Sequence, residues 1–173
     1  LVVRTVPEQS LSAFLEARFT YNSDLPLLAG EMQFYRDGTF IGSGRIDTFM
    51  PNEEISLAFG QDDRVRIEIR NDEEESRGGS TFRRNAVEDS RTRYLVTNFH
   101  QDAIDVEVLS RIPVAQNREI DVVINNAATP ATESDVDDKA GVLMWKVKAE
   151  PSEVAEIKHY FEVRYPEDER LQY

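Results

Sequence analysis

Apolar and polar residues alternate in short runs along most of this chain, and turn-forming residues separate the runs. Successive side chains of an extended strand point to opposite faces, so a period of two is typical of strands that bury one face. The clearest two runs flank Asp37-Gly38, a dipeptide that favours the positive backbone angles of a tight hairpin turn. The sequence therefore predicts a hairpin with strands at 31–36 and 39–46.

Further strands are expected wherever the same alternation recurs. Periodicity predicts them at 13–21, 55–59, 65–70, 94–98, 104–108, 120–124, 143–148 and 157–165. A weak helical pattern covers residues 152–158, and the turn around Pro151 competes with it. Short strands at this spacing, with Gly, Pro and Asn turns, are typical of sandwiches and barrels. We therefore expect an all-β fold, an antiparallel β-sandwich of about ten strands with little or no helix, built as a single module over residues 1–173.

The charge balance limits the class of partner. The net charge is −13 and the isoelectric point is near 4.6, whereas binding to phosphate backbones or anionic membranes needs clustered Lys and Arg. The chain has no cysteine, so it has no disulfide framework and no thiolate metal site. No run approaches the roughly 20 apolar residues of a spanning helix. We expect no nucleic-acid partner and no membrane insertion by this part of the protein, which begins at Leu1 without an initiator methionine and is expected to be a fragment.

Three features of the sequence could indicate a catalytic or metal-binding site. Gly42-Ser43-Gly44 lacks the spacing of a nucleophile elbow and the third glycine of a dinucleotide loop, so it predicts a glycine kink or bulge in a strand. The segment 135–141 resembles a calcium loop, but Lys139 stands where an oxygen ligand is needed. His100 and His159 are far apart in sequence and predict a turn residue and a core-edge residue. We expect no catalytic residues, no metal ligands and no cofactor.

Paired carboxylates and the single tryptophan allow a carbohydrate hypothesis. Glu53-Glu54 and Asp62-Asp63 could serve a glycosidase, which needs two separated carboxyl groups. Adjacent residues of a strand point to opposite faces, however, so solvated turns are the favoured interpretation. Trp145 could stack on a sugar, but it shares its parity with Leu143 and Val147, which favours a core position.

Arginine is locally enriched in the second third of the chain. Arg64, Arg66 and Arg70 share one face of a predicted strand, and the arginines that follow are Arg77, Arg83, Arg84, Arg91 and Arg93. Guanidinium groups can bind carboxylates of an acidic glycan or of a protein partner. They can equally pair with acids on neighbouring strands and discourage edge-to-edge association. The candidate ligand or partner face comprises Arg64, Arg66, Arg70, Arg83 and Arg84.

Several longer motifs follow one another along nearly the whole chain. They are Leu25-Pro-Leu-Leu-Ala-Gly30, Phe34-Tyr-Arg-Asp-Gly38, Pro51-Asn-Glu-Glu54, Leu57-Ala-Phe-Gly60, Gly141-Val-Leu-Met-Trp145 and Tyr160-Phe-Glu-Val-Arg-Tyr-Pro166. Each alone is ordinary hairpin sequence, so the specificity lies in their order. In that order the chain resembles the C-terminal region of the mucoidy inhibitor A-like proteins, a bacterial family with a domain of unknown function.

The resemblance implies a β-rich C-terminal module that follows a coiled coil and a further N-terminal β domain. It implies a link to the control of mucoid or capsular polysaccharide, a place in the periplasm or cell envelope, and no catalytic residues. The tryptophan-rich first half of the family region is missing here, so a sheet edge could be left open. We expect a non-catalytic interaction or scaffold module with a protein partner or self-association. An acidic-polysaccharide-binding module is the alternative, and a hydrolase is the weaker one.

Overall fold

The computed structural model describes residues 1–36, 38–72, 85–115, 117 and 119–166. These residues form twelve strands and one 3₁₀ turn, η1 (Val136–Asp138). The strands are β1 (Val2–Thr5), β2 (Phe14–Thr20), β3 (Gly30–Arg36), β4 (Thr39–Ile46), β5 (Glu54–Gln61), β6 (Val65–Asn71), β7 (Asn85–Asn98), β8 (Ile104–Arg111), β9 (Asp121–Ile124), β10 (Glu133–Ser134), β11 (Val142–Ala149) and β12 (Val154–Pro166). None of the described residues belongs to a helix with the length and apolar character needed to cross a membrane.

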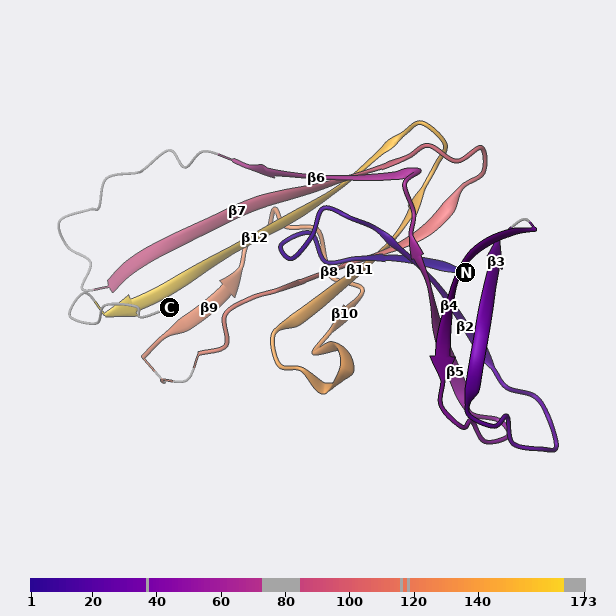
Figure 1. Cartoon of the computed structure of the whole chain (residues 1–173). Coiled ribbons are helices and arrows are strands. Elements are labelled where there is room, and N and C mark those ends of the chain that lie inside the picture. The colour runs from indigo at the N-terminus through magenta and orange to yellow at the C-terminus, as the bar shows by residue number, and fades with distance from the viewer. Residues whose placement is uncertain (37, 73–84, 116, 118, 167–173) are drawn as a thin grey trace.

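Two sheets pack face to face and confirm the predicted sandwich. One sheet has six strands in the order β10-β11-β8-β1-β2-β5, and the other has four in the order β6-β7-β12-β9. In Figure 1 the long strands β6, β7 and β12 run above β8 and β11. Alternate side chains of both sheets point into one shared core. Its members include Val3, Leu15, Ile67, Tyr94, Val96, Val108, Leu143, Trp145 and Ile157.

Strand β1 was not predicted, and one of its two pairings is parallel, unlike the antiparallel pairings expected for the whole fold. It lies between β2 and β8, antiparallel to β2 and parallel to β8. Val3 and Thr5 are buried while Arg4 between them faces outward. Four residues give too little alternation to reveal a strand, and a parallel neighbour is joined through a long connection that leaves no hairpin signal.

Strands β7 and β12 are longer than predicted. They pair over thirteen residues, from Val154 opposite Thr97 to Pro166 opposite Asn85. Strand β7 therefore begins nine residues before the predicted 94–98 segment, because Ser90 and Thr92 put polar groups on the inner face and hide the alternation. The weak helical pattern at 152–158 is wrong, since this segment enters β12 at Val154.

The predicted β3–β4 hairpin is confirmed, and it belongs to neither large sheet. Arg36 pairs with Thr39, and Gly38 has φ +78°, as an Asp-Gly turn requires. The glycine bulge is also confirmed: Phe34 faces Gly42 while Tyr35 faces Phe40, which leaves one extra residue on β4.

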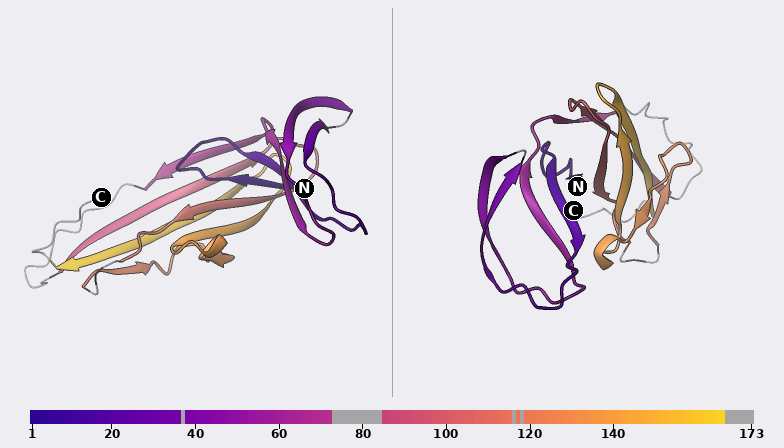
Figure 2. Two further views of the ribbon diagram at one scale, coloured as in Figure 1. Left: turned by 60° about the horizontal axis from the view of Figure 1, so that its bottom comes forward. Right: turned by 90° about the vertical axis from the view of Figure 1, so that its right-hand side faces the viewer.

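The hairpin and the loops that carry it project from the sandwich. We call residues 21–53 the arm; it comprises β3, β4 and the flanking loops 21–29 and 47–53. Figure 2 shows this part, in indigo and purple, standing to one side of the long strands. Phe34 anchors it, with its ring centroid 5.2 Å from that of Phe59 on β5. A Cβ added to Gly44 would lie 3.1 Å from the same Phe34 ring, so glycine there allows the close packing.

Candidate functional site

The predicted arginine face lies on the outer surface of the four-stranded sheet. Arg66 and Arg70 point outward from β6, and Arg64 directly precedes that strand; all three are exposed. Arg83 and Arg84, the other two members, lie outside the described residues, as does Arg77. The structure brings Arg70 directly opposite Arg93 of β7.

Most arginines of this surface are neutralised by acids of the same surface. Arg93 Nη2 lies 2.5 Å from Asp72 Oδ1, Arg91 Nη2 lies 2.8 Å from Asp89 Oδ2, and Arg70 Nη2 lies 3.3 Å from Glu68 Oε2. A hydrogen bond from the Tyr160 hydroxyl, together with Arg93, lowers the pKa of Asp72. The face is therefore largely a ladder of internal ion pairs.

Arg64 and Arg66 differ from Arg70, the other member of the predicted face that the structure describes. Neither forms an ion pair with a carboxylate among the described residues. The Arg66 guanidinium carbon lies 5.0 Å from the centroid of the Phe99 ring, within cation–π distance. Among the described members of the predicted face, these two arginines keep hydrogen-bonding capacity that no carboxylate uses.

Arg64 also lines a pocket of about 500 Å³ that contains a histidine–aspartate pair. His100 Nε2 lies 2.9 Å from Asp62 Oδ2, and Asp62 is only 2% exposed. The solvated-turn interpretation of Asp62-Asp63 is therefore wrong for Asp62, although His100 does lie in the predicted turn. The described lining contains no Ser, Thr, Cys, Lys or Tyr that this pair could activate as a nucleophile.

A second polar cluster joins the two sheets inside the core. We call Glu8, Tyr94, Ser110 and His159 the core knot. The Tyr94 and Ser110 hydroxyls donate to Glu8 Oε1 at 2.8 and 3.0 Å, and both lie near His159 Nδ1, at 3.1 and 3.2 Å. Sequence reasoning missed this group because its members come from a loop and three strands, and no local spacing links them.

The geometry of the core knot differs from that of a catalytic triad. In a triad the nucleophile and the carboxylate face opposite ring nitrogens, whereas here both hydroxyls meet the same nitrogen of His159. The two hydroxyl oxygens also lie 2.9 Å from each other, so Glu8, Tyr94, Ser110 and the Nδ1 side of His159 form one connected polar group. Nε2 is buried without a partner among the described residues. The centroid of the His159 ring lies 5.3 Å from that of Trp145 and 5.2 Å from that of Phe161. The core knot is a structural link with three members at most 3% exposed, Tyr94, Ser110 and His159.

His159 should make stability depend on pH. Burial lowers its pKa, because the charged imidazolium would lose its hydration inside the core, and the charge of Glu8 opposes this only in part. The unfolded chain then binds more protons below the ordinary value of about 6.5, so the free energy of unfolding falls as the pH drops, by up to about 1.4 kcal/mol per pH unit. Urea unfolding across this range should show that slope in the wild type and in Lys158→Gln, and a smaller one in His159→Gln. Equal slopes in all three proteins would contradict this assignment.

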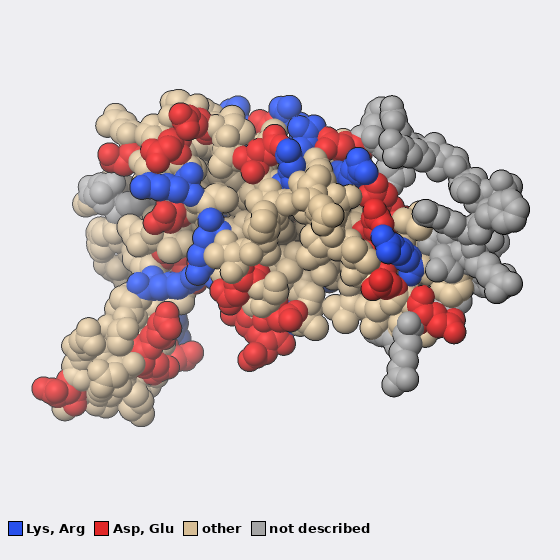
Figure 3. All heavy atoms as spheres, turned by 180° about the vertical axis from the view of Figure 1, so that it is seen from behind, with Lys and Arg blue, Asp and Glu red and all other residues tan. Residues whose placement is uncertain are grey.

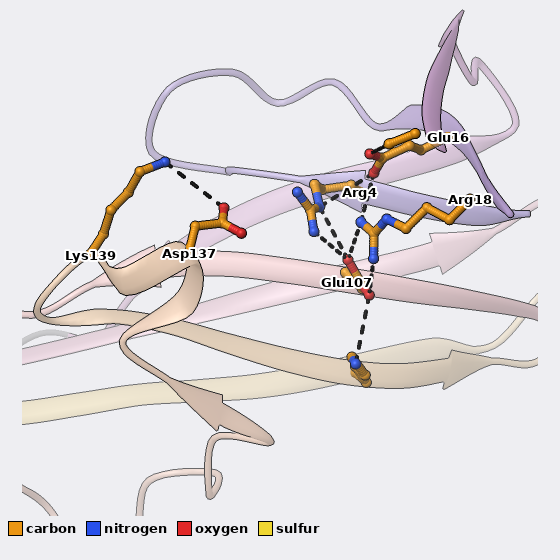
Figure 4. A network of polar contacts seen from close by, with 8 residues as sticks. Arg4, Glu16, Arg18, Glu107, Asp137 and Lys139 are labelled. Carbon is orange, nitrogen blue, oxygen red and sulfur yellow. Dashed lines mark hydrogen bonds and ion pairs between the residues drawn. The ribbon is translucent and has the colours of Figure 1, made fainter. Parts of the chain in front are cut away.

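The outer face of the six-stranded sheet carries a network of charges, shown in Figure 4. Glu107 of β8 accepts hydrogen bonds from Arg4 of β1 at 2.9 and 3.1 Å and from Arg18 of β2 at 2.8 and 2.9 Å. Arg18 also donates to Glu16 at 2.7 Å, and Lys146 Nζ lies 3.9 Å from Glu107. Burial opposes ionisation of Glu107, but the bonds from Arg18 and Arg4 outweigh it and lower its pKa. Both guanidinium groups are committed to Glu107 and Glu16, so this network is a strand-joining device.

The remaining candidates have structural roles. The Gly141 N–H donates to Asp135 Oδ1 at 2.8 Å, which closes the 135–141 loop, and the described residues contain no cluster of three or more His, Cys, Asp or Glu suited to a metal. Trp145 is 2% exposed and donates from Nε1 to the Thr129 carbonyl at 2.9 Å, which confirms the core prediction. Glu53 accepts from the Met50 N–H at 2.7 Å within the predicted turn.

Comparison with known proteins places the chain in a family. Residues 4–167 match the domain of unknown function DUF4139. The curated protein F37C4.5 of Caenorhabditis elegans is 25% identical over 180 residues, which cover 98% of this chain and 32% of the worm protein. The chain thus spans about a third of the length of that relative, and no solved structure matches it. The chain belongs to the DUF4139 family.

Proposed function

We propose that this chain is a non-catalytic interaction or scaffold module of a mucoidy inhibitor A-like protein of the cell envelope. The ordered motifs from Leu25 to Gly60 and from Gly141 to Pro166 support this finer placement within the DUF4139 family. The arrangement of polar groups supports a module without catalytic activity. His100 pairs with Asp62, and the hydroxyls of Tyr94 and Ser110 bond to Glu8 inside the core knot.

The exposed arm is the observation that carries the proposal. Leu25 is 72% exposed, Leu28 71%, Met50 58%, Tyr35 54% and Phe40 53%. Tyr35 and Phe40 pack against each other near the hairpin turn, whereas Leu25, Leu28 and Met50 lie in the loops at the other end of β3 and β4. Single exposed apolar side chains are ordinary, but groups of them on one projecting element support an interaction surface. On the outer face of the four-stranded sheet, by contrast, Arg70, Arg91 and Arg93 pair with carboxylates of the same face.

A crosslinking pull-down from envelope extract tests the proposal. With a photoreactive residue at Phe40 of the arm, we expect specific capture of a protein partner. The same residue at Lys148, which is exposed on β11 of the sandwich, should not capture that protein. Recovery of no specific partner at position 40, or turnover in a screen of glycoside and ester substrates, would count against an interaction module.

Recognition of an acidic polysaccharide is the second candidate, and Arg64 and Arg66 favour it because they lack an ionic partner among the described residues. Arg64→Glu with Arg66→Glu should abolish any binding on an array of acidic glycans, because both donors are replaced by like charges. Arg91→Glu is the matched control, since Arg91 is already paired with Asp89. An array on which the wild type binds no glycan removes this candidate.

A further inference from the structure

The end of the arm combines two properties that together point to one kind of partner. Its two loops, 21–29 and 47–53, expose Leu25, Leu28 and Met50 to solvent at 58–72%. The segments 21–31 and 47–54 contain five acidic residues and no lysine or arginine. We call this surface the arm tip; its acids are Asp24, Glu31, Asp47, Glu53 and Glu54.

The arm tip is an ordered surface, because backbone hydrogen bonds hold its two loops together. Leu27 and Phe49 exchange two backbone hydrogen bonds of 2.9 Å, and the Ala29 N–H donates to Thr48 Oγ1 at 3.1 Å. Tyr21 N–H donates to the Glu53 carbonyl, and Asn52 N–H to that of Tyr21, both at 2.8 Å. The exposed apolar side chains are therefore presented on a preformed platform, which reduces the entropy lost on binding.

The acidic side chains of the arm tip form no ion pairs among the described residues, although Arg45 of β4 lies opposite Glu31 in the β3–β4 register. Figure 3 shows the arm at lower left as tan and red spheres, with no blue sphere at its end. The side of the sandwich seen in this view differs, because blue and red spheres lie next to each other there.

We infer that the arm tip binds a basic, amphipathic segment of another protein. Apolar side chains of such a segment would cover Leu25, Leu28 and Met50, while its Lys and Arg would pair with the surrounding carboxylates. A tip-to-tip contact between two copies of this chain does not fit, since two arm tips would bring ten carboxylates together with no basic residue from either tip between them. An anionic lipid surface or a nucleic acid is disfavoured for the same reason. This inference rests on the proposed interaction function and adds the chemistry of the partner.

Fluorescence anisotropy with a labelled peptide of alternating Leu and Lys residues tests the inference. We expect the wild type to bind this peptide and not its Leu–Glu counterpart. Leu28→Ser with Met50→Ser should weaken binding by about tenfold or more, because two exposed apolar anchors are lost. Asp47→Lys with Glu54→Lys should weaken it similarly, and added salt should weaken wild-type binding.

Matched controls separate the arm tip from the general acidity of the chain. Leu11→Ser changes a leucine of 57% exposure outside the arm, and Glu150→Lys reverses an exposed charge on the sandwich. Both should bind as the wild type does, and the melting temperature of every variant should be unchanged. If the arm-tip substitutions left the affinity for the peptide unchanged, the inference would be overturned. It would also be overturned by a wild-type dimer that these substitutions dissociate.

The outcome distinguishes this inference from the broader proposal. If the photoreactive residue at Phe40 captures a partner but the arm-tip variants bind the Leu–Lys peptide normally, the interaction function stands and the basic-segment inference fails. If the peptide binds at the arm tip but no protein is captured from the extract, the surface chemistry stands and the scaffold function fails.

Discussion

Glu107→Ala is expected to lower the free energy of unfolding by about 3 kcal/mol or more. The side chain of Glu107 is only 5% exposed, and it accepts from two guanidinium groups on β1 and β2. Its removal leaves Arg4 and Arg18, each with a side chain less than 30% exposed, with Glu16 as a shared partner but without the more deeply buried carboxylate that accepts from both. Urea denaturation at neutral pH measures the loss.

A surface ion pair provides the matched control for Glu107. Glu68→Ala removes the partner of Arg70, in a pair whose side chains are 43% and 59% exposed. Its expected cost is below about 1 kcal/mol, since water already screens such pairs. A loss of equal size in Glu68→Ala and Glu107→Ala would show that the network contributes nothing beyond an ordinary surface pair.

Acidic pH should remove the stabilisation that Glu107 contributes to the folded protein. The pKa of Glu107 is lowered in the folded protein, so its contribution is complete above the ordinary carboxyl value and is lost as the pH falls through the lowered folded value. The pKa of Glu16 is also lowered, as the bonds from Arg18 and Ser56 outweigh the opposing effect of burial. Glu107→Gln should therefore be less sensitive to acid than the wild type.

Local features of this fold could be predicted from sequence. The Asp37-Gly38 hairpin, the glycine bulge, the core position of Trp145 and most strands follow from turn chemistry and from a period of two, which act over a few residues. The same local rules predict that Glu107 points outward from its strand, where a carboxylate is expected to be exposed to solvent. Its burial comes from Arg4, which is 103 residues distant in sequence.

The candidate sites depended on contacts that no local pattern contains. The sequence indicated an arginine-rich face but could not show that Arg93 meets Asp72 across two strands, because register decides which charges are neighbours. The core knot was missed for the same reason, since Ser110 and His159 lie 49 residues apart. One property of the arm tip is visible in the sequence, because the segments around Leu28 and Met50 lack basic residues. Only the structure places these two loops side by side.

Trp145→Ala should be as damaging as the loss of Glu107, at about 3–5 kcal/mol. The indole is 2% exposed, and its ring centroid lies 5.3 Å from that of His159 and 6.4 Å from that of Tyr94. Truncation would leave a cavity beside the core knot and free the Thr129 carbonyl that accepts the Nε1 hydrogen bond.

Two further variants divide this effect into packing and hydrogen bonding. Trp145→Phe keeps most of the ring volume but loses the donor to Thr129, so it should cost about 1–2 kcal/mol and raise amide exchange mainly in the 125–132 loop. Val154→Ala removes an apolar side chain that is 56% exposed, and its effect should stay within about 0.5 kcal/mol. If Trp145→Ala were as mild as Val154→Ala, the indole would not be a core residue and the carbohydrate-platform hypothesis for Trp145 would need to be tested again.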